Sequence, residues 1–80
     1  MKLYHLLQTD NNDYDTYDSC IVCAESYEDA ITITPEDELF VENEKYTSWA
    51  IKSSSIQCFE IGIANNTLKR GVVMSSFKAG

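Results

Sequence analysis

A chain of 80 residues is long enough for one domain, which we place at residues 1–80. Its hydrophobic content of 44% supports one compact core and argues against disorder. Its formal net charge of −7 disfavours direct binding to nucleic acid, whose phosphates would be repelled. Apolar runs fall far short of the roughly 20 residues of a membrane span, and the start of the chain turns polar too soon for a secretory signal. We therefore expect a soluble, cytoplasmic protein that does not bind a membrane.

The acidic residues are concentrated in one part of the chain. No lysine or arginine occurs from Leu3 to Glu44, and this segment holds 12 of the 13 acidic residues. The segment from Lys45 to Gly80 carries a single acid, Glu60, and five of the six bases. Such a segment would attract a basic partner and speed its association at low salt. The alternative is that the acidic surface only promotes solubility.

Three segments near the amino terminus have recognisable patterns. Alternation in Lys2–Gln8 predicts a strand, although seven residues do not by themselves exclude a helix. The polar composition of Thr9–Asp18 predicts a loop. Ser19–Ala24 is short, apolar and rich in β-forming residues, which predicts a buried strand.

A helix is predicted next. Ser26 followed three residues later by Asp29 resembles a capping box, and the apolar residues after it predict about two helical turns. The helix should stop before Pro35, which disfavours helical backbone at the residue preceding it. Glu36–Ser48 has no clear period and is expected to be irregular, while Trp49 is expected in the core.

The carboxyl-terminal part of the chain predicts two more strands. Ser55–Ile63 alternates over nine residues, with Gly62 as a candidate for a bulge or for a close contact. Ala64–Arg70 is expected to form a turn or one helical turn, capped by Gly71, before a last strand at Val72–Phe77. The whole order predicts an α+β fold, a small and mostly antiparallel sheet of about four strands with one short helix packed on it.

The three cysteines do not form an obvious framework. Cys20, Cys23 and Cys58 are too few, and odd in number, for a disulfide scaffold. Cys20 and Cys23 could join His5 in a zinc site, but strand-forming residues separate them, and positions three apart in a strand point to opposite faces. We expect these cysteines in the core and predict no cofactor.

A calcium loop is the other metal site to consider. Asn11, Asp13 and Asp15 occupy alternate positions, as the first ligands of an EF-hand do. The sixth position of such a loop should be glycine and is Thr16, and the twelfth should be glutamate and is Val22. We predict no EF-hand, and another kind of metal site in this loop stays open.

Catalysis is not expected. His5 is the only histidine, and the chain contains no nucleophile elbow, P-loop or dinucleotide-binding motif. Abundant carboxylates alone do not make an acid–base pair, which needs two groups in distinct environments. The sequence therefore predicts a protein that is not an enzyme.

The loop that contains Asn11–Ser19, with the sequence NNDYDTYDS, has the composition of a recognition surface. Tyrosine offers large contact area at low entropic cost, and carboxylates pair with guanidinium groups. Alternatively, Asn and Asp side chains in such a loop bond to nearby backbone and hold it rigid, with Asn12 and Asp18 as candidates. The predicted binding residues are Asn11, Asp13, Tyr14, Asp15, Tyr17, Asp18, Glu28, Glu36 and Asp37.

The runs MKLYHLLQTDNNDYDTYDSCIVCAESYEDA and IGIANNTLKRGVVMSSFKAG resemble a family of small, uncharacterised proteins encoded by phages and prophages. These proteins share the N-x-Y-D-T-Y-D-S loop and a G-V-V-x-S-S-F-x-A-G ending. The segment Thr32–Ser55 departs from the family, with Thr34-Pro35 where a histidine–proline pair is usual. The resemblance implies a phage accessory gene and brings no known activity, catalytic residue or cofactor. It also suggests that the loop and Ser75–Phe77 come together.

The resulting hypothesis is a non-enzymatic phage accessory protein in the host cytoplasm. It would inhibit a host nucleic-acid-binding or defence complex, of the anti-CRISPR or anti-restriction type, by presenting its Asp/Tyr face to a basic protein or nucleoprotein. The alternative is a homo-oligomer that binds or sequesters a nucleotide or metabolite. In that case the loop, with Ser75 and Ser76, would line a pocket.

Overall fold

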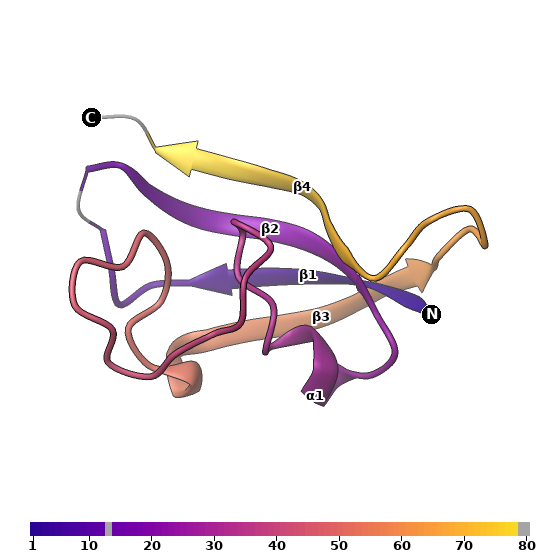
Figure 1. The fold of residues 1–80 in the computed structure, drawn as a ribbon, viewed down its shortest axis with the longest axis horizontal. Helices are drawn as coiled ribbons and strands as arrows, with labels where there is room; N and C mark the ends of the chain where they lie inside the picture. Colours follow the sequence, from indigo (N-terminus) through magenta and orange to yellow (C-terminus); the bar gives the residue numbers. More distant parts are fainter. Residues whose placement is uncertain (13, 79–80) are drawn as a thin grey trace.

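The computed structural model describes residues 1–12 and 14–78. Four strands form one antiparallel sheet in the order β3-β1-β2-β4, and a single helix packs on it (Figure 1). The elements are β1 (Lys2–Gln8), β2 (Thr16–Ala24), α1 (Tyr27–Ala30), the 3-10 turn η1 (Ser53–Ser55), β3 (Ile56–Ile63) and β4 (Gly71–Lys78). The predicted α+β fold is confirmed. No helix in the described ranges is long and apolar enough to span a membrane.

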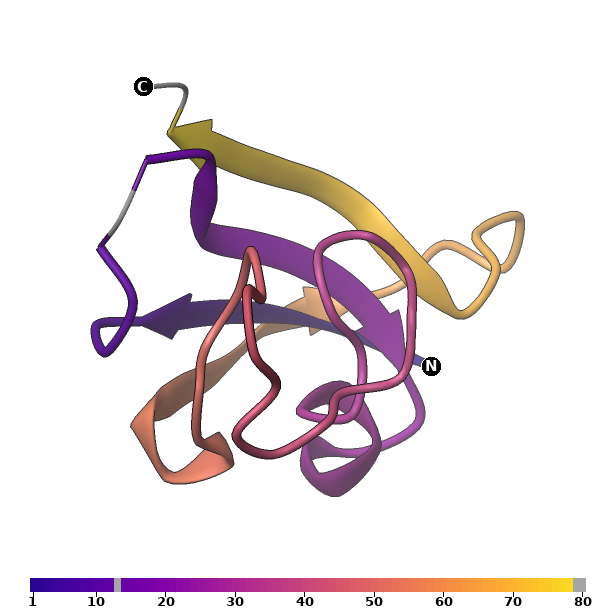
Figure 2. The same cartoon turned by 60° about the vertical axis from the view of Figure 1, so that its left-hand side comes forward.

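One face of the sheet is covered and the other is open. Tyr4 and Leu6 of β1 lie opposite Val22 and Cys20 of β2 and point into the core. The core is closed by side chains from the segment between β2 and β3 and from the start of β3, namely Ala30, Ile33, Trp49, Ala50 and Ile56. Figures 1 and 2 show α1 and the irregular chain after it lying together over this face. The predicted core position of Trp49 is confirmed, since its side chain is almost fully buried.

The helix is shorter than predicted. Ser26 caps it as expected, accepting a hydrogen bond from the Asp29 amide at 3.1 Å, but only Tyr27–Ala30 is helical. Thr32 then donates both its amide and its hydroxyl to the Asp29 carbonyl, and Ile33 pairs with Leu39 in an isolated bridge. These tertiary and turn contacts end the helix after one turn, before the predicted stop is reached.

Strand β2 begins three residues before its predicted start. The register pairs Thr16 with Lys78 and Tyr17 with Phe77, and the rings of Tyr17 and Phe77 meet edge to face with centroids 4.7 Å apart. Pairing with β4 therefore draws the end of the predicted loop into the sheet. The expected proximity of this loop to Ser75–Phe77 is confirmed.

Two glycines mark irregular points of the sheet. The register shifts in β3 between Glu60 and Gly62, which confirms the predicted bulge. Gly71 was predicted to cap a turn but is the first residue of β4, with a φ of +138°. A Cβ at this position would lie 2.7 Å from a carboxylate oxygen of Asp37, so a side chain there would collide with the irregular segment.

Candidate binding surface

Most of the acidic residues lie in the layer that covers the sheet. We call residues 25–46, which comprise α1 and the irregular chain after it, the acidic cover. It contains eight acids and one base, Lys45. Ala30, Ile33 and Phe40 fasten it to the sheet through the core. Ala30, Ile33 and Phe40 therefore face the sheet, whereas seven of the eight acidic residues of the cover are exposed.

Half of these carboxylates are used to hold the fold together. The Asp29 carboxylate bonds to Arg70, with the closest atoms 2.7 Å apart, and this contact lowers the pKa of Asp29. Glu42 accepts from the hydroxyl and the amide of Ser53, and these bonds lower its pKa. The other two contacts join Glu36 to the Ser48 hydroxyl and Asp37 to the Val72 amide.

The other half remain available to a partner. The side chains of Glu25, Glu28, Glu38 and Glu44 are exposed, and within the described part of the chain they make no hydrogen bond or ion pair. Among them lie exposed apolar side chains, of which Leu39 is 73% exposed and Val41 about half exposed. Carboxylates next to apolar contact area are the combination that an interface with a basic protein requires.

Tyr46 stands at the end of the cover and is the most exposed large side chain there, at 92%. Its backbone has a φ of +64°, a left-handed conformation that bulky residues rarely adopt. The ammonium group of Lys45 lies 5.2 Å from the centre of its ring. The Tyr46 side chain therefore points outward from a strained backbone, and its ring already makes a cation–π contact with Lys45.

The predicted loop supports the irregular chain that follows the cover more than it forms a site of its own. Asn11 is buried, and its amide group donates to the carbonyls of Thr47 at 3.0 Å and Trp49 at 2.8 Å. Asp10 accepts from the amides of Ile51 and Lys52, each at 3.0 Å. Burial raises the pKa of Asp10, but these hydrogen bonds outweigh it and the net shift is downward. The first half of the loop is thus structural.

The remaining predicted residues of the loop differ in how exposed their side chains are. Tyr14 is 74% exposed, and Asp15 is also exposed, with a φ of +61°. Tyr17 is half-buried against Phe77 and offers little surface. Asp18 is exposed on β2, and among the described residues its side chain makes none of the hydrogen bonds expected of a loop fastener. Asp10 has that role instead. Asp13 lies outside the described residues.

Of the predicted residues on the cover, Glu28 is exposed and unpaired, whereas Glu36 and Asp37 bond internally. Sequence reasoning missed Glu25, Glu38, Glu44 and Tyr46 as residues of the binding surface. The acids on both sides of Leu39 and Val41 in EDELFVENEKY were visible, but the sequence did not show which side chains point outward.

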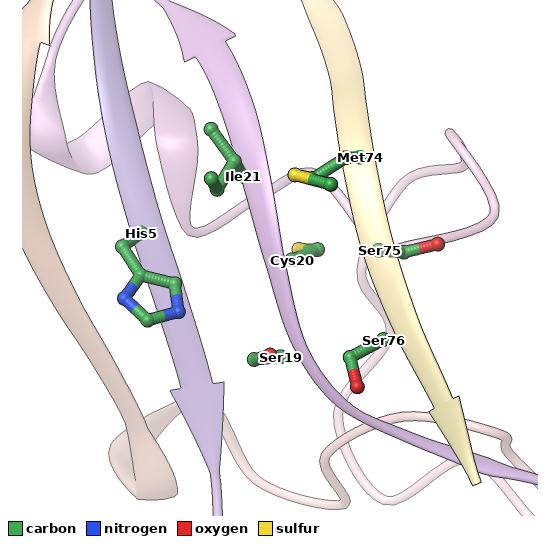
Figure 3. A pocket seen from close by; sticks show the side chains of 7 residues that line it. All are labelled: His5, Ser19, Cys20, Ile21, Met74, Ser75 and Ser76. Carbon is green, nitrogen blue, oxygen red and sulfur yellow. The ribbon is translucent and has the colours of Figure 1, made fainter.

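A separate hollow lies on the open face of the sheet, between β1, β2 and β4 (Figure 3). Its volume is about 170 Å³, and it is lined by His5, Ser19, Cys20, Ile21, Met74, Ser75 and Ser76. Burial raises the pKa of the Cys20 thiol to about 12, so this cysteine stays protonated at neutral pH. The predicted ligand pocket joined these serines to the acidic loop, but none of the described residues of that loop, Asn11, Asn12 and Tyr14–Asp18, lines this hollow.

Within residues 1–12 and 14–78, no group of three or more histidine, cysteine or acidic residues is placed to hold a metal ion. Cys20 and Cys23 are both buried, and their register partners place them on opposite faces of β2. Comparison of the chain with protein-family models, curated proteins and solved structures found no match. The resemblance to phage proteins therefore stays a prediction.

Proposed function

We propose that this protein is a non-enzymatic binding protein of the phage accessory kind. It inhibits a host nucleic-acid-binding or defence complex by docking the acidic cover onto that partner's basic surface. The observation that carries the proposal is the set of four unpaired carboxylates, Glu25, Glu28, Glu38 and Glu44, in one layer of the fold.

Two of the chain's positive charges are already neutralised by ion pairs, and this supports the assignment. Lys2 pairs with Glu60 at 3.1 Å, and Arg70 pairs with Asp29. The free carboxylates of the cover therefore keep a field that attracts lysine and arginine. A partner whose basic groove normally holds phosphates would lose nucleic acid when the cover occupies that groove.

The exposed apolar groups of the cover give the contact its specificity. Tyr46 provides an aromatic ring for a guanidinium group, and Leu39 provides apolar area beside Glu38. Tyr14, in the loop before β2, offers a further exposed aromatic side chain. Tyr17 contributes through its packing on Phe77, which holds the strand that follows the loop.

The small-ligand alternative has less support. A second hollow, of about 150 Å³, lies next to the loop and is lined by Asn11, Glu44, Tyr46, Thr47 and Ile51. The Asn11 amide group, which would be its main donor, already bonds to two backbone carbonyls. Neither this hollow nor the one on the open face brings the tyrosines and aspartates of the loop together with Ser75 and Ser76.

A capture experiment tests the proposal. Tagged protein is incubated with nuclease-treated bacterial lysate at low and at high salt, and bound proteins are identified by mass spectrometry. We expect a basic, nucleic-acid-binding partner that is retained at low salt and released at high salt. The purified partner should then lose labelled nucleic acid when the protein is added.

Matched variants locate the contact. Glu38→Gln combined with Glu44→Gln should weaken the complex at least tenfold, and Tyr46→Ala should weaken it further. Glu60→Gln, which removes a charge from β3, should leave it unchanged. Tyr17→Ala is not a suitable probe because it disrupts packing on Phe77. Capture that is indifferent to salt, or equal for Glu60→Gln and the double variant, contradicts the proposal.

A further inference from the structure

The open face of the sheet lacks the charged side chains that are common on the solvent-exposed face of a sheet. The register assigns to it the residues that alternate with the core positions, namely Leu3, His5, Leu7, Ser19, Ile21, Cys23, Gln57, Phe59, Gly62, Gly71, Met74 and Ser76. None of these twelve is an aspartate, glutamate, lysine or arginine. Solvent-facing strand positions are normally polar and often charged, because such a face does not exclude water.

Apolar side chains on this face are accessible from solvent. Phe59 is 53% exposed and Met74 is 62% exposed, and Ile21 lies between their strands on β2. Figure 3 shows Ile21 and Met74 around the hollow, together with His5. Within the described chain, α1 and the irregular segment pack on the opposite face of the sheet. The molecule therefore carries a second surface that is chemically unlike the acidic cover.

We propose that this open face is a dimer interface, on which a second copy of the same chain docks with its own open face. Charge decides which face a copy would use. A chain with a net charge of −7 repels its copies through most of its surface, and the uncharged face is where that repulsion is smallest.

The geometry of stacked sheets keeps the acidic covers apart. Facing sheets pack about 10 Å apart. Each cover lies beyond its own sheet, so the two covers would be separated by roughly 30 Å if the layers have similar spacing. That is several times the Debye length of about 8 Å at physiological salt, so the covers barely repel each other. Both covers remain on the outside and free for a basic partner.

The available area fits a weak and reversible dimer. Four strands spaced about 4.8 Å apart, each seven to nine residues long, present a face of roughly 500 Å². Two such faces remove about 1,000 Å² from solvent, which is the lower limit for a specific interface. We therefore expect a dimer whose population depends on concentration. It is independent of the proposed function, since the two surfaces share no residue.

Sedimentation velocity over a wide range of protein concentration tests this proposal. The wild-type mass should rise from 9.1 kDa towards twice that value as concentration increases. Phe59→Glu should remain monomeric, because it places a charge in the uncharged face. Leu39→Glu is the matched control, since it adds the same charge at an exposed apolar position on the cover and should dimerise as the wild type does.

Circular dichroism and thermal unfolding of each variant confirm that it is folded, which both exposed positions should permit. A wild-type protein that stays monomeric at every concentration overturns the proposal, because the open face then does not bind a second copy. Equal dimerisation of Phe59→Glu and Leu39→Glu also overturns it, because the contact would then lie elsewhere. Loss of the dimer in both variants would show a general effect of charge and overturn it as well.

Discussion

Single residues of the amino-terminal loop fasten the irregular chain between the cover and β3 to the sheet. Asn11 is the clearest case, because its side chain donates to two backbone carbonyls from residues far along the chain. Its own amide donates to the side chain of Gln8, which in turn donates to the carbonyls of Asn11 and Tyr17. This buried network satisfies polar backbone that the irregular segment would otherwise leave unpaired.

Replacing Asn11 with alanine should lower the free energy of unfolding by about 1–3 kcal/mol, because two buried carbonyls lose their donor. Chemical denaturation monitored by circular dichroism measures this change. Asn12→Ala is the matched control, since Asn12 is exposed and makes one bond of 3.3 Å to Thr9; it should cost less than about 0.5 kcal/mol. Equal losses for the two variants would contradict the assigned role of Asn11.

At the scale of elements, the start of β4 depends on a contact that is distant in sequence. Asp37 stands beside Gly71, and its carboxylate accepts from the amide of Val72 at 3.2 Å. The turn of the cover around Asp37 therefore sets where the last strand begins. Pairing of β4 with β2 in turn extends β2 back to Thr16.

Gly71→Ala should destabilise the protein by about 1–3 kcal/mol, because its φ of +138° and the 2.7 Å approach of Asp37 both disfavour a side chain. The other strand glycine is a direct comparison. A Cβ at Gly62 would meet nothing within 4 Å, so Gly62→Ala should change stability little. Urea denaturation midpoints decide between them, and a larger loss at Gly62 would refute this account.

At the scale of the whole molecule, the fold separates two kinds of surface. The acidic cover and the uncharged open face lie on opposite sides of one sheet. Part of the negative charge also stabilises the fold, since the pKa values of Asp10, Asp29 and Glu42 are lowered by their contacts. Some acidic side chains of this protein therefore form a candidate binding surface, and others stabilise the fold.

Stability should consequently fall in acid. A carboxyl whose pKa is lower in the folded state contributes stability that is full above its ordinary pKa and lost as pH falls through the lowered value. For Asp29 the ordinary value is 3.8, so the loss begins near pH 4 and continues below it. Urea unfolding across pH 7 to pH 3 should show this decline, with a shallower slope for Asp29→Asn.

Glu25→Gln is the control for that measurement, because the Glu25 carboxylate has no partner within the described chain and its removal should preserve the wild-type slope. An unchanged slope in Asp29→Asn would mean that the contact with Arg70 does not stabilise the fold. An increase of stability towards pH 3 would mean that relief of repulsion among the carboxylates outweighs their contacts.

The sequence by itself determined the properties that arise locally. Alternation indicated β1, without excluding a helix, and located β3. The Ser26–Asp29 pair located the start of α1, and the absence of bases from Leu3 to Glu44 fixed the sign of the surface. Strand periodicity, helix capping and charge depend on neighbouring residues, so they are visible before the chain folds. The core position of Trp49 is predicted for a similar reason, because size and apolarity are properties of the single residue and do not depend on the fold.

Only the tertiary structure decided what depends on partners far along the chain. Pairing with β4 brought Tyr17 into the sheet, and contacts of Thr32 and Ile33 ended α1 after one turn. The structure also separated the carboxylates that bond internally from those that stay free, and left one face of the sheet open. These outcomes depend on which residues the fold brings together, and no local pattern encodes that.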